Sequence, residues 1–116
     1  MREKTRLFYE SELTKLQPII DFVCDFMDVH ESDFYNYKGK GKTNISFCKQ
    51  MISFLADKQG ITHINIGRKL YPNNSQAHAC IIYNVKQIKI RKEINDIQKP
   101  TILKIERNFK KMLNNI

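Results

Sequence analysis

Amide and imidazole side chains cluster just before a strongly amphipathic segment of the chain. Asn73, Asn74 and Gln76 carry amides, which pair bidentately with N6 and N7 of adenine in the major groove of DNA. His78 donates or accepts a single hydrogen bond according to its tautomer. Asn is equally a common turn residue, so a plain loop is the alternative interpretation. We treat these four residues as candidate contacts to base edges.

The segment that must position them, residues 61–92, predicts a helix-turn-helix. Thr62 is a suitable cap for a short helix through Leu70, and residues 71–75 have the composition of a turn. A long helix is then expected over residues 76–94. In such a motif the second helix enters the major groove with its first residues at the base edges.

Apolar residues recur along the long helix at helical spacing and are expected to anchor it to a core: Ile81, Ile82, Val85 and Ile88. The polar residues expected to project elsewhere are Asn84, Lys86, Lys89, Arg91 and Lys92. Near the end of this helix, Ile90 and Ile94 are expected to pack against a final helix. The basic residues then form either a DNA-facing side or a solvated one.

A basic loop and the helix after it supply candidate phosphate contacts. The loop NYKGKGKT precedes a helix expected over residues 44–58, which Thr43 would cap and Gly60 would end. We expect this helix to bury Ile45, Cys48, Ile52 and Leu55, and to hold Lys49 and Gln50 near its exposed side. The full set of candidate phosphate contacts is Lys38, Lys40, Lys42, Thr43, Lys49, Gln50 and Lys86. A solvated surface is again the alternative.

Charge is segregated along the chain. Residues 1–37 hold 4 Lys/Arg and 8 Asp/Glu, whereas residues 38–116 hold 16 and 4. Base composition of the gene would add lysines without separating them from acids. Concentrated positive charge is typical of proteins that bind polyanions. Asp21, Asp25 and Asp28 should line the outer face of the first helix and point away from DNA.

The 116 residues are expected to form one all-α, compact, multi-helix domain with a C-terminal helical extension. Residues 1–13 form either a short docking helix or a frayed lead-in, and residues 14–94 form the domain proper. Thr14 and Gln17 resemble a capping box, which places Pro18 in the first turn of a helix to about Val29. Residues 95–116 contain a final amphipathic helix with an apolar stripe of Ile102, Ile105, Phe109, Met112 and Leu113.

Several function classes lack support in the sequence. The residues Gly41-Lys42-Thr43 resemble the end of a P-loop, but Asn36 stands where the pattern needs glycine. Three separated His residues and three Cys residues form no metal or catalytic pattern, so we expect no enzyme, cofactor or metal. No apolar run reaches the length of a membrane span, and the N-terminus lacks a signal peptide pattern. A soluble, cytoplasmic protein is expected.

The segment HACIIYNVKQI at residues 78–88 resembles the signature helix of the C-terminal DNA-binding domain of the bacterial replication initiator DnaA. Ile66-Gly67 and Lys49-Gln50-Met51 also stand where that family has its IG and RQ-apolar motifs. The resemblance covers roughly residues 14–92. It implies a helix-turn-helix of the Trp-repressor kind in a divergent, stand-alone version of the domain.

The chain departs from the family at positions of base and phosphate readout. Ala77 replaces an acidic residue, Ala79 and Cys80 replace Ser/Thr, and Phe47 replaces a minor-groove arginine. The resemblance implies a sequence-preferring, double-stranded DNA-binding protein from a bacterium, phage or mobile element. Its expected role lies in replication initiation control or transcription regulation. The departures favour an alternative, a protein-interaction module that docks partners through the acidic first helix or the Phe109–Leu113 helix.

Overall fold

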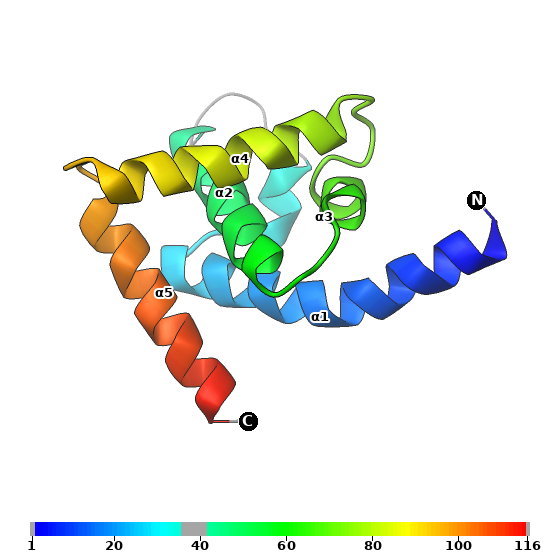
Figure 1. The fold of residues 1–116 in the computed structure, drawn as a ribbon, viewed down its shortest axis with the longest axis horizontal. Coiled ribbons are helices and arrows are strands. Elements are labelled where there is room, and N and C mark those ends of the chain that lie inside the picture. The colour runs from blue at the N-terminus through cyan, green and yellow to red at the C-terminus, as the bar shows by residue number, and fades with distance from the viewer. Residues whose placement is uncertain (1, 36–41, 116) are drawn as a thin grey trace.

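The structure, a computed structural model, describes residues 2–35 and 42–115, and within those ranges it contains helices and no strand (Figure 1). The all-α prediction is therefore confirmed. The elements in chain order are α1 (Glu3–Met27), the 3-10 helix η1 (Glu31–Phe34), α2 (Lys42–Lys58), α3 (His63–Leu70), α4 (Ala77–Glu93) and α5 (Lys99–Asn114).

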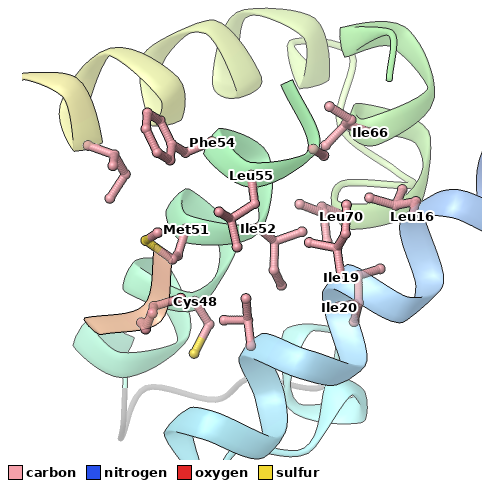
Figure 2. Close-up of a cluster of buried hydrophobic side chains, with 14 of the residues drawn as sticks. Leu16, Ile19, Ile20, Cys48, Met51, Ile52, Phe54, Leu55, Ile66 and Leu70 are labelled. Atoms are coloured by element: carbon pink, nitrogen blue, oxygen red, sulfur yellow. The ribbon is translucent and has the colours of Figure 1, made fainter. Parts of the chain in front are cut away.

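Helix α2 is the centre of the fold. It lies between α4 and α1, which run along opposite sides of the molecule (Figure 1). The predicted inward residues Cys48, Ile52 and Leu55 are buried, and Ile45 is half-buried. Figure 2 shows side chains from α1, α2 and α3 meeting around α2. Burial of this apolar surface is the main force that holds the helices together.

Helix α1 starts much earlier than predicted. It begins at Glu3, so Thr14 is an interior residue whose hydroxyl donates to the carbonyl of Ser11, 2.7 Å away, and caps nothing. Pro18 is likewise inside the helix and not in its first turn. Tertiary packing outweighs the proline, because Leu16 and the residues after Pro18 are buried against α2 and α3.

A carboxylate from α1 binds the start of α3. Glu12 is 6% exposed and accepts hydrogen bonds from the Thr62 amide, the Thr62 hydroxyl and the Asn65 amide, at 3.2, 2.6 and 2.8 Å. Thr62 does occupy the cap position of α3, but its hydroxyl serves Glu12 and makes no capping bond. The segment predicted to be a lead-in is thereby attached to α3.

Left-handed residues end the first two long helices. Gly60 has φ 81° and follows α2, as predicted, with the Ile61 amide donating to the Ala56 carbonyl. Asp28 has φ 55° and ends α1 in the same way, with the Val29 amide donating to the Cys24 carbonyl. Both are Schellman ends, which satisfy carbonyls that have no partner within the helix.

Helices α3 and α4 approach closely where Gly67 faces Ala77. A Cβ atom on Gly67 would lie 3.0 Å from the Ala77 Cβ and 3.3 Å from its carbonyl carbon. Small residues at both positions allow the two helices to pack at this distance. The short side chain at position 77 thus has a packing role at the entrance to α4.

Helix α5 packs on the body through one apolar stripe and an ion-pair cluster. Ile102, Ile105 and Phe109 are buried, while the Glu106 carboxylate lies 2.9 Å from the Lys58 ammonium and 2.8 Å from that of Lys92. The prediction for Ile90 and Ile94 is wrong, because both are exposed, at 38% and 52%. The side of α4 that carries Lys92 turns toward α5 in their place. Within the described residues, no helix has the length and apolar character needed to cross a membrane.

Candidate nucleic-acid interface

The inner face of α4 differs from the predicted stripe by one residue. Ile81, Val85 and Ile88 are buried as expected, but Asn84 completes the face and Ile82 does not. The Asn84 amide donates to the Ser53 hydroxyl at 3.2 Å and to the Tyr71 hydroxyl at 3.0 Å. These bonds compensate for burying a polar group. Asn84 is therefore a structural residue and not one that projects to a ligand.

The outer face of α4 consists of Ala79, Ile82, Tyr83 and Lys86, all of them exposed. Ile82 is 48% and Tyr83 55% exposed. Tyr83 was not among the predicted site residues, yet it lies at the centre of this face. The helical spacing contained the signal, since residues 81, 84, 85 and 88 share one side and 79, 82, 83 and 86 share the other. Because Asn84 is polar, its residue type suggests an outward side chain, and this hides the helical pattern in the sequence.

The turn between α3 and α4 exposes all three of its amide residues, Asn73, Asn74 and Gln76, but one of them is used within the turn. The Asn74 side-chain oxygen accepts from the Gln76 backbone amide at 2.7 Å, which closes an Asx turn. Asn73 and Gln76 are exposed, and no hydrogen bond involves their side chains among the described residues. Asn74 therefore shapes the loop, while Asn73 and Gln76 present their amides beside the start of α4.

His78 is exposed in the first turn of α4, at the place predicted for a base contact. Its ring centroid lies 5.8 Å from that of His63. The His63 Nε2 atom is 2.6 Å from an Asp57 carboxylate oxygen, so that imidazole is held by α2. His78 has no such partner among the described residues and remains available to a ligand.

The prediction that Lys49 lies near an exposed side is wrong. Its ammonium donates to the Phe34 carbonyl at 3.1 Å and lies 4.4 Å from the centre of the Tyr71 ring. Burial lowers the pKa of Lys49 because desolvation disfavours the charged ammonium. The side chain is half-buried and joins α2 to η1.

Gln50 is also misplaced by the sequence prediction. It is 8% exposed, and its amide oxygen accepts from the Arg91 guanidinium at 2.6 Å. This bond attaches α2 to the end of α4. Gln50 is thereby buried, while Arg91 stays half-exposed.

The basic loop is only partly within the described residues. Lys38 and Lys40 fall outside them. Lys42 and Thr43 belong to the first turn of α2, and their side chains also fall outside the description. Thr43 is not the cap of α2, since the helix already includes Lys42.

The cations of α4 divide into two groups. Lys92 is paired with Glu106 at 2.8 Å, whereas Lys86 and Lys89 are exposed and have no ion-pair partner among the described residues. Asp21, Asp25 and Asp28 are exposed on α1, as predicted. Because α1 lies across α2 from α4, these acids are remote from the outer face of α4 (Figure 1). On this side of α4 the exposed charged residues are Lys86, Lys89 and Glu93, so positive charge is in excess.

The thiols and acidic groups form no metal centre in residues 2–35 and 42–115. Burial raises the pKa of Cys24 to about 11 and that of Cys48 to about 12. Such thiols stay protonated at neutral pH and are poor nucleophiles and poor ligands. Cys80 is half-exposed and accepts a weak contact from the Asn74 amide at 3.8 Å.

Comparison of the chain with protein-family models, curated proteins and solved structures finds no match. The resemblance to the initiator domain remains an expectation from the residues quoted above.

Proposed function

We propose that the chain binds double-stranded DNA through the outer face of α4 and the turn that precedes it. One observation carries this proposal: the outer face stands free of the fold. It includes Lys86, and the exposed Lys89 lies at its edge; neither lysine has an ion-pair partner within the described part of the chain. The exposed amides of Asn73 and Gln76 lie at the N-terminal end of this face. An α-helix with its first turns exposed in this way fits the major groove.

The two kinds of side chain would contribute differently. Lys86 and Lys89 lie farther along α4 and would neutralise phosphates, which supplies affinity without sequence information. Asn73, Gln76 and His78 lie near the helix start, where a docked helix meets the base edges. This division supports sequence-preferring binding, and the resemblance to the initiator domain supports a role in replication initiation control or transcription regulation.

Fluorescence anisotropy with labelled duplexes tests the proposal. Lys86→Glu combined with Lys89→Glu should weaken binding at least about tenfold. It should also reduce the steepness of the fall of log affinity with log salt by about 2. Lys4→Glu with Lys111→Glu makes the same change in net charge at exposed positions of α1 and α5 and serves as the matched control. Equal losses in both variants, or wild-type binding that is insensitive to salt, would contradict the proposal.

A groove beside α5 favours a second candidate function, the docking of an acidic protein segment. The groove has a volume of about 730 Å³ and lies between the end of α2 and α5. Leu55, Leu103, Phe109 and Leu113 provide its apolar lining. Its charged residues are Lys58, Lys92, Arg107, Lys110 and a single acid, Glu106. An amphipathic helix with acidic flanks would match both the lining and the excess of positive charge.

The two functions are separable by substitution. Leu103→Glu adds a negative charge to the groove and should abolish binding of a synthetic Leu/Glu amphipathic peptide while leaving DNA binding intact. The Lys86→Glu, Lys89→Glu variant should behave in the opposite way. A groove variant that alters DNA affinity as strongly as the α4 variant would contradict this assignment of functions to surfaces.

A further inference from the structure

The part of α4 that would enter a groove is almost free of charge. The exposed side chains of its first turns are His78, Ala79, Ile82 and Tyr83, and the first cation of the helix is Lys86. No Lys or Arg occurs anywhere between Pro72 and Val85. The surface that would face base edges is therefore apolar and amide-bearing. Its positive charge begins only farther along α4, at Lys86.

Side chains of these types are suited to contact A·T base pairs and not G·C base pairs. Guanine is most often read by the bidentate fork of Arg or by Lys at O6 and N7, and this surface has neither. Adenine is read by Asn or Gln at N6 and N7, and thymine by apolar contact with its C5 methyl group. Asn73 and Gln76 supply exposed amides, while Ala79 and Ile82 supply apolar contact. His78 can donate one hydrogen bond to the N7 atom of either purine, so it does not distinguish adenine from guanine.

Ile82 is an exposed apolar residue on the outer face of α4. Its neighbour Ile81 is fully buried, whereas Ile82 is 48% exposed and lies beside Tyr83, which is 55% exposed. Both side chains lie one turn before Lys86 on the same face. A helix positioned by the Lys86 contact to phosphate would bring this apolar pair against the floor of the groove, where thymine methyl groups project.

We propose that the surface formed by Ala79, Ile82 and Tyr83 selects A·T base pairs by contact with thymine methyl groups, with Asn73 and Gln76 binding the adenine partners. This inference rests on the proposed DNA binding and deepens it. The ligand is duplex DNA whose contacted positions are A·T rich, read through the methyl group and not only through groove shape.

Replacing thymine with uracil tests the inference directly, because the two bases differ only in the C5 methyl group. Duplexes selected by the wild-type chain from a random pool should be A·T rich at the contacted positions. Uracil at those positions should weaken binding about 4-fold for each contacted methyl group. Ile82→Ala should reduce the difference between thymine and uracil, because it removes part of the apolar contact, while the salt dependence stays unchanged.

Ile97→Ala is the matched control, since Ile97 is 93% exposed and lies beyond the end of α4. It should keep the full sensitivity to uracil. A G·C-rich selected sequence, or equal affinity for thymine and uracil duplexes with a normal salt slope, would overturn the inference and leave DNA binding standing. Absence of salt-dependent binding to any duplex would instead overturn the proposed function, and the inference with it.

Discussion

The two faces of α4 contain side chains of the same kind, but one face buries them and the other exposes them. Ile81 on the inner face is 0% exposed, and Ile82, the next residue, is 48% exposed on the outer face. The inner face includes a polar residue, Asn84, while the outer face includes Ile82 and Tyr83. Residue type therefore does not define the faces of this helix. The neighbouring helices define them, because they supply partners to one side only.

The sharpest test of this comparison is a pair of alanine substitutions at adjacent isoleucines. Ile81→Ala removes fully buried apolar volume and should lower the free energy of unfolding by about 2–5 kcal/mol. Ile82→Ala should change it by less than about 1 kcal/mol, because the side chain already contacts solvent. Urea unfolding followed by circular dichroism measures both. Similar losses at the two positions would mean that the faces are not distinct.

Asn84 and Asn73 extend the test to polar residues. Asn84→Ala removes both hydrogen bonds of the buried amide, to the Ser53 and Tyr71 hydroxyls, and should cost about 1–3 kcal/mol of stability. Asn73→Ala should be nearly neutral for stability and should weaken DNA binding under the proposed function. Urea unfolding and anisotropy separate the two effects. A stable Asn84→Ala variant would show that this buried amide is not needed.

The contact between Gly67 and Ala77 tests how tightly the inner face is held. Gly67→Ala should destabilise the protein by about 1 kcal/mol despite the better helix propensity of alanine, since its Cβ would lie 3.0 Å from the Ala77 Cβ. Adding Ala77→Gly should relieve the overlap, so the double variant should be more stable than the sum of the two single changes predicts. Additive losses in thermal unfolding would contradict a direct contact.

The pH dependence of stability distinguishes Lys92, which is paired with Glu106, from Lys86, which has no ion-pair partner among the described residues. Burial raises the pKa of Glu106, but hydrogen bonds and charge from Lys92 and Lys58 outweigh it and lower that pKa below 4.5 overall. The stability that Glu106 contributes is therefore present above pH 4.5 and is lost as pH falls through its folded value. Lys92→Gln should make the free energy of unfolding depend less on pH in this range, and Lys86→Gln should leave that dependence unchanged. Identical acid unfolding curves for these two variants would contradict the difference between Lys92 and Lys86.

Much of the fold follows from local signals. Gly60 marks the end of α2, Thr62 precedes α3, and the apolar spacing of α4 and α5 predicts helices close to those observed. The start of α1 does not follow from such signals. Thr14 and Pro18 favour a helix start there, yet contacts of Glu12 with α3 and of Leu16 with the core keep the helix continuous from Glu3.

The candidate site is less predictable than the fold. The sequence predicts the amides of the turn and His78 as site residues, and the structure leaves Asn73, Asn74, Gln76 and His78 exposed, with Asn74 also closing the turn. Lys49 and Gln50 are expected at the surface because isolated side chains of these types favour water. Both instead have partners from distant parts of the chain, the Phe34 carbonyl and Arg91, which no local pattern identifies.

The sequence alone predicts an all-helical chain, and the structure has one in its described residues. The sequence also shows the separation of acidic from basic residues, and the amides and imidazole near the start of an amphipathic helix. Only the tertiary structure decides which cations of α4 are paired, and that Asn84 and not Ile82 faces the core. The physical reason is that helix formation depends on neighbours a few residues away. Burial and pairing depend on groups brought together from α1, α2 and α5, so the binding face emerges only when the helices pack.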